Sequence, residues 1–208
     1  MQNLYLDVSS LDQRSVTKFA LSEEVMMEHA ALAMAHVIRA RFSSDSSILI
    51  VCGSGNNGAD GLALARLLEG DYLISLHIPF GASSPLAHLQ RNRTEALGLK
   101  HAPLEGEYDV VVDALFGSGL NRTLGPTAIE ALVFMNQTNG YKIACDLPSG
   151  LHADGTLDKH IFNADITVTM GSLKRGLFSD AAKEVVGEII VTDLGIHRRY
   201  YETPSLWK

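Results

Sequence analysis

Apolar and polar positions along the chain follow two spacings, one typical of helices and one typical of buried strands. Residues 23–41 carry apolar side chains at helical spacing without proline or glycine, and Ser22 before them is a favourable helix cap. Nearly continuous apolar runs follow in SILIVCG, YDVVVDALFG and YKIACDLPSG, as expected for parallel strands that are buried on both faces. The pattern therefore predicts a helix over 23–41 and then alternating strands and helices.

The remaining elements continue this alternation. Three further strands are expected in YLISLHI, ADITVTMGS and GEIIVTDLG, and a weak one near His101. Ser10 and Gln13 resemble a capping box at the start of an N-terminal helix. Three more helices are predicted, over 58–68, 85–97 and 126–137.

Repeated strand–helix alternation indicates the fold class. It predicts an α/β protein, a Rossmann-like three-layer α/β/α sandwich with a mostly parallel central sheet and N-terminal helices. We expect one domain over 1–208, with its core over about 10–196 and a polar tail, 197–208, that packs loosely. In such sheets ligands bind beyond the carboxyl ends of the strands, so the loops that follow the apolar runs are the places to look for chemistry.

Composition and charge narrow the possible partners. The chain has 208 residues with 17 Lys and Arg against 24 Asp and Glu, so its formal net charge is −7. This charge argues against nucleic acid or an anionic membrane as the main partner. The sequence has no signal-peptide pattern and no apolar run near transmembrane length, so we expect a cytoplasmic protein. Cys52 and Cys145 lie near the ends of apolar runs and are expected to be buried free thiols.

A glycine-rich turn follows the first apolar run. Gly53, Gly55 and Gly58 satisfy G-x-G-x-x-G, which is typical of a loop that binds a dinucleotide at a helix N-terminus. An ordinary NAD site also needs an acidic residue at the end of the second strand, but that strand ends in HIPFG and Asp71 precedes it. A generic tight turn and a different chemistry on the same scaffold both remain open.

Polar side chains at this turn and at two other strand ends suggest a site. Asn56, Asn57 and Asp60 are explained in part as helix-capping residues, but their oxygens also suit a hard cation or ribose hydroxyls. Asp113 and Asp146 each end an apolar strand, where a lone aspartate is most often a turn residue. The loop GSGLNRTLG offers backbone N–H groups and an arginine for phosphate. A lysine in GSLKRGL reaches the pocket only if its strand lies beside ACDLPSG.

At this point the segments resemble a known family. GSGNNGADGLALARLL, DVVVDALFGSGLNR, ACDLPSGLHADGT and ADITVTMGSLKRGL occur in the order and spacing of the YjeF N-terminal domain, and LSEEVMMEHAALA resembles its first long helix. The resemblance covers about residues 11–196 and implies an NAD(P)H-hydrate epimerase. Such an isomerase interconverts the R and S epimers of hydrated NADH and NADPH (NADHX and NADPHX), so that a partner dehydratase can restore the cofactor. It also implies a bound potassium ion (K+) and a homodimer.

The resemblance also implies roles for individual residues. Asp146 would contact the reacting ring, where we expect it to act as general base, and Lys174 matches a family lysine near the pocket. Oxygen ligands for K+ would come from Asn57, Asp113 and Ser149. Substrate would be bound by Asn56, Asn57, Gly58, Ala59, Asp60 and Asp146, and by the phosphate-binding loop Gly117, Ser118, Gly119, Leu120, Asn121, Arg122 and Thr123.

Two positions depart from the family pattern. Ala59 stands where a second glycine is usual, and His29 stands where asparagine is common. An added methyl group in a tight loop disfavours positive φ or crowds a ligand, which puts turnover in question. Two other functions therefore stay open: a non-catalytic nucleotide-sensing or scaffold module, and an NAD(P) oxidoreductase.

Overall fold

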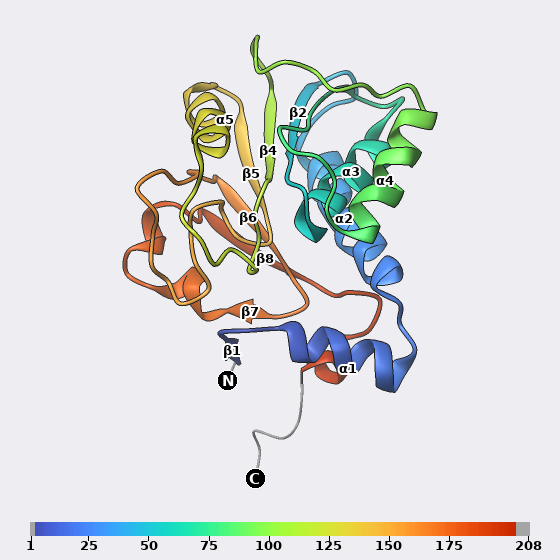
Figure 1. Cartoon of the computed structure of the whole chain (residues 1–208), viewed down its shortest axis with the longest axis vertical. Helices are drawn as coiled ribbons and strands as arrows, with labels where there is room; N and C mark the ends of the chain where they lie inside the picture. The colour runs from blue at the N-terminus through green and yellow to red at the C-terminus, as the bar shows by residue number, and fades with distance from the viewer. Residues whose placement is uncertain (1–2, 203–208) are drawn as a thin grey trace.

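A six-stranded sheet organises the protein, whose computed structural model describes residues 3–202 (Figure 1). All neighbouring strands pair in parallel, in the order β3-β2-β4-β5-β6-β8. The sheet is therefore wholly parallel, where the sequence predicted a mostly parallel one. Its strands are β2 (Ser47–Cys52), β3 (Leu73–His77), β4 (Val110–Ala114), β5 (Tyr141–Cys145), β6 (Ile166–Met170) and β8 (Glu188–Thr192).

Helices cover both faces of the sheet, which confirms the three-layer prediction. Alternate side chains of each strand point to opposite faces, so Ile48 and Ile50 belong to one apolar core while Leu49 and Val51 belong to another. Figure 1 shows helices on both sides of the sheet. They are α2 (Glu23–Arg41), α3 (Asn56–Leu68) and α4 (Pro85–Ala96) on the first face, and α5 (Pro126–Gln137) on the second.

The order of the strands creates a crevice at one point of the sheet edge. The chain leaves β2 for β3 on one side and then returns to place β4 on the other side of β2. The loops after β2 and β4 therefore diverge at the carboxyl ends of these strands, which is where α/β sheets bind ligands. This topology brings the glycine-rich turn and the 117–123 loop to the same crevice.

Most element boundaries follow the sequence pattern, with three differences. Helix α2 begins as predicted, and the Ser22 hydroxyl accepts a hydrogen bond from the Val25 amide at 3.2 Å. Helix α3 begins two residues earlier than Gly58, and the strand near His101 is reduced to a single bridge. The capping box at Ser10 was wrong, since α1 (Ser9–Phe19) already includes that residue; the Asp7 carboxylate accepts from the Ser9 amide instead.

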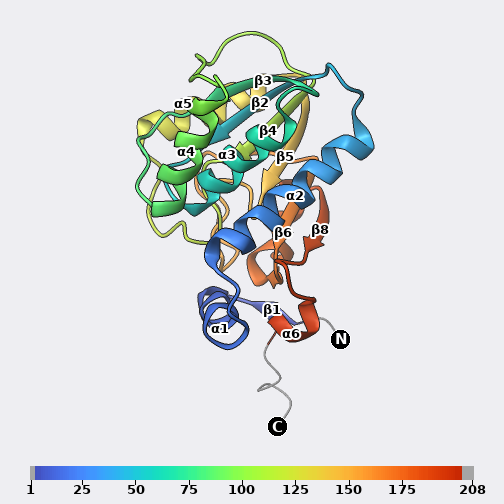
Figure 2. The same ribbon diagram turned by 90° about the vertical axis from the view of Figure 1, so that its right-hand side faces the viewer.

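Segments from both ends of the chain close the edge of the sheet that carries the crevice (Figure 2). Near the start, β1 (Leu4–Tyr5) pairs in parallel with β7 (Leu173–Lys174), and two short 3-10 turns follow, η1 (Arg175–Phe178) and η2 (Ala182–Glu184). A final helical turn, α6 (Arg198–Tyr201), packs on α1. The expectation that residues after 196 pack loosely was therefore wrong for this turn, because Tyr201 is buried; residues 203–208 lie outside the described part of the chain.

Two smaller findings complete the fold. Cys52 and Cys145 are free thiols buried within β2 and β5, as predicted, and burial raises the pKa of both. Within residues 3–202, every helix is too short or too polar to cross a membrane.

Candidate functional site

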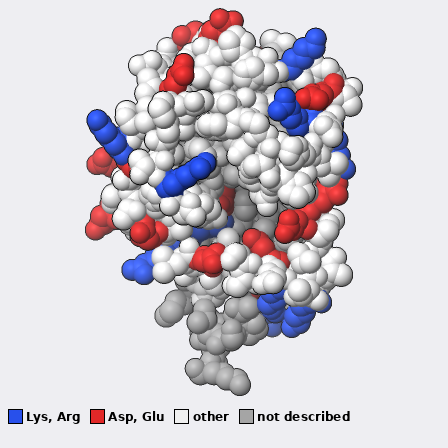
Figure 3. Space-filling view, viewed as in Figure 1, with Lys and Arg blue, Asp and Glu red and all other residues white. Residues whose placement is uncertain are grey.

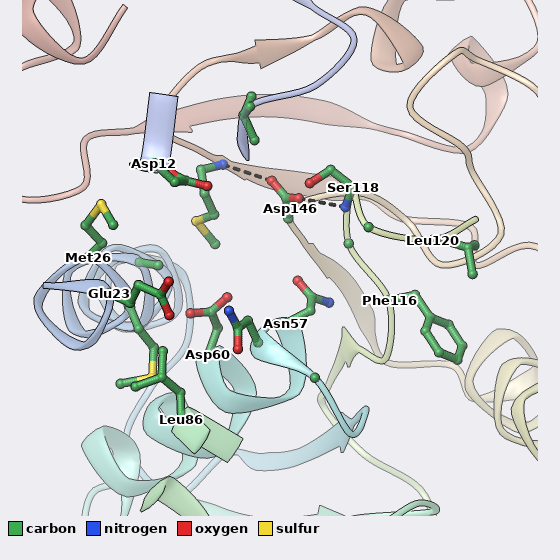
Figure 4. Close-up of a pocket in the computed structure, with 18 of the residues that line it drawn as sticks. Asp12, Glu23, Met26, Asn57, Asp60, Leu86, Phe116, Ser118, Leu120 and Asp146 are labelled. Atoms are coloured by element: carbon green, nitrogen blue, oxygen red, sulfur yellow. Dashed lines mark hydrogen bonds between the residues drawn. The ribbon is translucent and has the colours of Figure 1, made fainter. Parts of the chain in front are cut away.

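A cavity of about 490 Å³ opens at the crevice between the loops that follow β2 and β4. Helices α1 and α2 form one of its walls, and Tyr201 closes part of its base. Figure 3 shows acidic side chains bordering a hollow on this face of the molecule. Figure 4 shows Asn57, Asp60 and Asp146 facing the same space from different elements. The fold thus brings together residues that lie about 90 positions apart in the sequence.

Asp146, the first residue after β5, forms a buried ion pair with Lys174. Lys174 Nζ donates to Asp146 Oδ1 at 2.5 Å and to the Met170 carbonyl at 2.6 Å, and the lysine is only 1% exposed. Strand β6, which precedes Lys174, lies beside β5, which precedes Asp146. This is the strand arrangement that the sequence-based prediction required for Lys174 to reach the pocket. Burial opposes ionisation of Asp146, but Lys174 and the Ser118 amide (3.0 Å) outweigh it and lower the pKa of this carboxyl group.

Asp146 also has an unusual backbone conformation. Its φ is +70°, in the left-handed region that residues other than glycine rarely occupy. Such a conformation costs about 1–3 kcal/mol and persists only where the surrounding structure imposes it. The preceding strand, the Lys174 ion pair and the Ser118 hydrogen bond hold Asp146 in place and direct its carboxylate into the cavity.

The glycine-rich turn allows α3 to begin very close to β2. A β-carbon at Gly58 would lie 1.9 Å from the Gly53 carbonyl oxygen, and one at Gly53 would lie 1.9 Å from the Leu115 carbonyl oxygen. Gly55, by contrast, has open space around it. The first turn of α3 therefore faces the cavity with amide groups that the helix itself leaves without partners, and these suit an anionic or polar ligand.

Three polar side chains of this turn have different surroundings. Asn56 is exposed at the cavity, while the buried Nδ2 of Asn57 has no hydrogen-bond partner in the described structure. Asp60 lines the cavity, and its pKa is raised well above the usual value, first by burial and then by the nearby Asp146 carboxylate. Asp60 therefore keeps its proton more readily than an ordinary aspartic acid does.

The loop after β4 forms the opposite wall of the cavity. Gly117, Ser118, Gly119, Leu120, Asn121 and Arg122 line it, whereas Thr123 lines a smaller neighbouring hollow. A β-carbon at Gly117 would lie 2.9 Å from both Asn57 Oδ1 and Asp146 Oδ2, so glycine is needed here for these oxygens to approach the loop. Arg122 is exposed at the rim. Backbone amides and one cationic side chain suit a phosphate group.

Asp113 and Ser149 lie behind the cavity wall and are fully buried. The Ser149 amide and hydroxyl each donate to the Asp113 carboxylate at 2.7 Å, and the Leu115 amide donates at 3.1 Å. Burial raises the pKa of Asp113 to about 6, although these hydrogen bonds favour its charged form. Within residues 3–202 no cationic side chain forms an ion pair with it.

The three residues expected to hold a cation carry donors that are compatible with a monovalent ion. The Asp113 carboxylate, the Ser149 hydroxyl and the Asn57 amide oxygen are hard oxygen ligands with a single negative charge. The buried Asn57 Nδ2 has no hydrogen-bond partner in the described structure, which is unusual for a buried polar atom. Among the described residues no group of three His, Cys, Asp or Glu side chains has the arrangement of a metal site, so the candidate depends on neutral oxygens.

Two predicted substrate-binding residues, Gly58 and Ala59, and the unusual His29 also lie away from the cavity surface. Gly58 and Ala59 are buried under the first turn of α3, where Gly58 permits close packing and Ala59 contributes its methyl group to the core. Ala59 is helical, so its methyl group causes neither a positive-φ strain nor a narrowing of the cavity. His29 is an exposed residue of α2 that contacts the Gly195 region.

Sequence reasoning missed three titratable side chains of the cavity, Asp12, Glu23 and Tyr201. The Tyr201 hydroxyl donates to Asp12 Oδ1 at 2.7 Å. Burial raises the pKa of Asp12, partly offset by this hydrogen bond and by Lys174, and burial also raises the pKa of Tyr201. Asp12 follows buried Leu11 in α1, a weak sign of a carboxylate beside the core, whereas no periodicity in the tail marks Tyr201.

Comparison with known proteins identifies the relatives of this chain. The family described as "YjeF-related protein N-terminus" matches residues 23–176. The chain is 38% identical to the bifunctional NAD(P)H-hydrate repair enzyme Nnr of Helicobacter pylori over 213 residues, covering 99% of this chain and 45% of that protein. It is 34% identical to the NAD(P)H-hydrate epimerase of Elusimicrobium minutum, covering 89% of this chain and 91% of that protein.

A solved structure shares the fold. The crystal structure of yeast ynu0 superposes with a TM-score of 0.76 at 15% identity, over 96% of this chain and 92% of that one. The chain thus spans somewhat less than half of the bifunctional relative and nearly the whole of the epimerase. The matched segment includes the glycine-rich turn, the 117–123 loop, Asp146 and Lys174, and the chain belongs to the YjeF-related protein N-terminus family.

Proposed function

We propose that this chain is an NAD(P)H-hydrate epimerase, an isomerase that interconverts the R and S epimers of NADHX and NADPHX. The observation that carries this proposal is the strained, lysine-paired Asp146 at the cavity, surrounded by a helix N-terminus and an amide-rich loop. A relative that the chain covers almost completely carries the same name. The arrangement suits proton transfer at one end of a phosphorylated ligand.

Asp146 acts as the proton carrier in this proposal. Its ionised carboxylate takes the proton of the hydroxyl group at C6 of the hydrated nicotinamide ring. The C6–O bond then becomes a carbonyl, the C6–N1 bond breaks, and its electron pair passes to N1. After rotation, N1 attacks the other face of the carbonyl, and Asp146 returns the proton to the oxygen. Lys174 keeps Asp146 ionised and oriented before each cycle.

The two walls of the cavity hold the rest of the substrate. The amides at the start of α3 and the loop from Gly117 to Thr123 bind the diphosphate, with Arg122 supplying positive charge at the rim. Asn56, Asn57 and Asp60 contact ribose hydroxyls or the carboxamide. The raised pKa of Asp60 favours its protonated form, and a protonated carboxyl group would donate a hydrogen bond to a carbonyl oxygen.

A potassium ion completes the site in this proposal. Asn57, Asp113 and Ser149 would hold it, and its charge would balance the buried Asp113 carboxylate. When bound, the ion supplies a fixed positive charge behind the cavity wall and ties the three loops together. These three residues do not take part in proton transfer.

We propose two partners besides the substrate. The bifunctional relatives carry the name of a repair enzyme, so the product is expected to pass to an NAD(P)HX dehydratase, either as a separate protein or as a further domain. A homodimer is proposed from the family resemblance, and size-exclusion chromatography with light scattering tests it by giving about twice the 22.5 kDa of one chain.

The decisive experiment follows epimer interconversion directly. Purified S-NADHX is incubated with the protein, and the appearance of the R epimer is measured by HPLC against the spontaneous rate. Asp146→Asn is the matched control, because asparagine has the same shape and tolerates positive φ. We expect the variant to fold and to lose roughly 100-fold or more of the accelerated rate. A wild-type-like rate in Asp146→Asn would remove Asp146 as the proton carrier.

The same samples separate the two alternative functions. A sensing or scaffold module binds NADHX in a calorimeter without accelerating its epimerisation. An oxidoreductase prefers unmodified NAD over NADHX and transfers hydride to a second substrate. Preferential binding of NADHX together with acceleration supports the epimerase.

A further inference from the structure

The C-terminal turn contributes a side chain to the cavity. Tyr201 is 1% exposed, and its ring packs against Gly171, where a β-carbon would come within 2.7 Å of ring atoms. Its hydroxyl donates to Asp12 Oδ1 at 2.7 Å, a contact between residues 189 positions apart. The turn is held in place because Arg14 of α1 donates to the Tyr201 carbonyl at 3.3 Å.

Asp12 stands near the Lys174–Asp146 pair. Lys174 Nζ uses two of its three N–H donors, on Asp146 and on the Met170 carbonyl, and its positive charge favours the ionised form of Asp12. Asp12 and Asp146 thus lie at the same cavity (Figure 4), and the charge of Lys174 acts on both, through a direct ion pair with Asp146 and at longer range on Asp12. An ionised Asp12 attracts the Lys174 ammonium group and repels the Asp146 carboxylate. Both interactions make Asp146 a stronger base.

We propose that the Tyr201–Asp12 hydrogen bond holds a positioning residue, Asp12, that sets the reactivity of Asp146 through Lys174. The Tyr201 hydroxyl favours ionised Asp12 in a buried place where burial alone opposes ionisation. Without this hydrogen bond Asp12 takes up a proton more readily, and Lys174 then pairs with Asp146 alone. This inference rests on the proposed function, in which Asp146 accepts the proton.

Other titratable groups also contribute to the electrostatic surroundings of the Lys174–Asp146 pair. Asp60 interacts with Asp146, and Tyr5 on β1 lies in register with Lys174 on β7. Neither forms a hydrogen bond to Asp12 or Asp146. Besides the pair itself, the charged or titratable side chains that line the cavity or lie in register with Lys174 are Tyr5, Asp12, Glu23, Asp60, Arg122 and Tyr201.

The experiment compares Tyr201→Phe and Asp12→Asn with the matched control Tyr200→Phe. Phenylalanine keeps the buried ring of residue 201 and removes only the hydroxyl group, while asparagine keeps an acceptor for Tyr201 and removes the charge. Tyr200 is 56% exposed, and its hydroxyl forms no hydrogen bond in the described structure. Epimerisation kcat and KM, melting temperature and the 13C-carboxyl NMR titration of Asp146 are measured for each variant, with Asp146→Asn assigning the resonance.

We expect Asp12→Asn and Tyr201→Phe each to lower kcat roughly threefold to tenfold with KM nearly unchanged, and the double variant to lose no more than the worse single one. The Asp146 titration should move to lower pH in both single variants. Tyr200→Phe should match wild type in every readout. A purely structural role would instead lower the melting temperature and leave kcat per folded molecule and the titration unchanged.

Two results overturn the inference. One is a wild-type titration of Asp146 in Asp12→Asn, and the other is wild-type kcat in a folded Tyr201→Phe. The NMR readout does not need turnover, so it decides the coupling even if the wild-type protein does not epimerise NADHX. In that case the proposed function fails, while a shifted titration still establishes that Asp12 acts on Asp146.

Discussion

Single residues of the cavity show how surroundings separate chemically identical groups. Asp60 and Asp146 are both carboxyl groups of one cavity, but Lys174 and two amides stabilise the charge of Asp146, while burial and the charge of Asp146 oppose ionisation of Asp60. Groups whose pKa values are pushed apart in this way can act as base and acid at one pH. In the function proposed above, Asp146 would therefore be ready to accept a proton before substrate binds.

The Asp60→Asn variant tests this difference in pKa, because the pKa of a buried group affects how protein stability depends on pH. Because the folded pKa of Asp60 is raised, the native state binds more protons than the unfolded chain, and stability falls as pH rises from about 4 through the folded pKa. We expect the melting temperature of Asp60→Asn relative to wild type to increase over this window and then to level off. Thermal denaturation at a series of pH values between 4 and 8 measures it.

Asp154→Asn is the control, because the pKa of Asp154 is lowered whereas the pKa of Asp60 is raised. Hydrogen bonds from Thr156 lower the pKa of the exposed Asp154, so its ionised form favours the folded state above the unfolded pKa. This variant should lie at or slightly below wild type at neutral pH. If the difference in melting temperature between Asp60→Asn and wild type does not change with pH, the carboxyl group of Asp60 is not desolvated.

Two aspartates of the candidate site could be predicted from the sequence because each ends an apolar strand. Asp113 and Asp146 follow apolar runs, so their place at the carboxyl edge follows from parallel-sheet geometry. The positive φ of Asp146 could not be predicted, because no local pattern marks it and the residues that hold its carboxylate, Lys174 and Ser118, are distant in sequence. Tyr201 has no local signal at all, since only tertiary packing buries it.

At the scale of elements, the junction between β2 and α3 depends on two glycines. Their hydrogen atoms permit backbone contacts that no side chain would fit, since an added β-carbon would overlap a carbonyl oxygen at 1.9 Å in each case. This close approach sets where the first turn of α3 points, and hence where Asn56 and Asn57 meet the cavity. Packing, rather than positive φ, explains these glycines.

Gly58→Ala should therefore destabilise the protein strongly. The overlap with the Gly53 carbonyl forces backbone movement, and we expect a loss of about 2–3 kcal/mol in the free energy of unfolding, measured by urea denaturation. Gly55→Ala is the matched control, because nothing lies within 4 Å of its added β-carbon. The control should change stability by less than about 0.5 kcal/mol. Equal effects at both positions would contradict the packing argument.

Elements were predicted well where local signals agreed with tertiary packing. Helix α2 has the predicted bounds, since a capping serine and an uninterrupted apolar pattern point to the same start and end. Strand β1 and helix α6 were not predicted, because two to four residues carry too little periodicity. Lys174 was treated as a loop residue for the same reason, although β7 pairs with β1 and buries it.

At the scale of the whole molecule, the site is formed by loops that follow different strands. These loops lie next to one another only when the complete sheet has formed. The candidate cation ligands come from the start of α3, the end of β4 and the turn after β5. Strand order places these three segments side by side, which the parallel topology made predictable. The contribution of α1 and α6 was not predictable, since it depends on how the chain ends fold back.

Potassium should stabilise this arrangement as a whole. An ion that binds the folded chain alone raises the melting temperature by mass action, by about 2–4 °C for each kcal/mol of binding free energy. We expect a higher melting temperature in KCl than in choline chloride at the same ionic strength. Asp113→Asn should lose most of this increment, while Asp154→Asn should keep it. Identical melting temperatures in the two salts would argue against the cation site.

The contact between Tyr201 and Asp12 also has a consequence for the order in which the molecule folds. The hydrogen bond joins residues 189 positions apart, so it forms only when the two ends of the chain meet. Such a distant contact has a larger loop-closure cost than the local contacts within helices. In the inference above, Asp146 therefore reaches its full basicity only in molecules whose two ends have docked on each other.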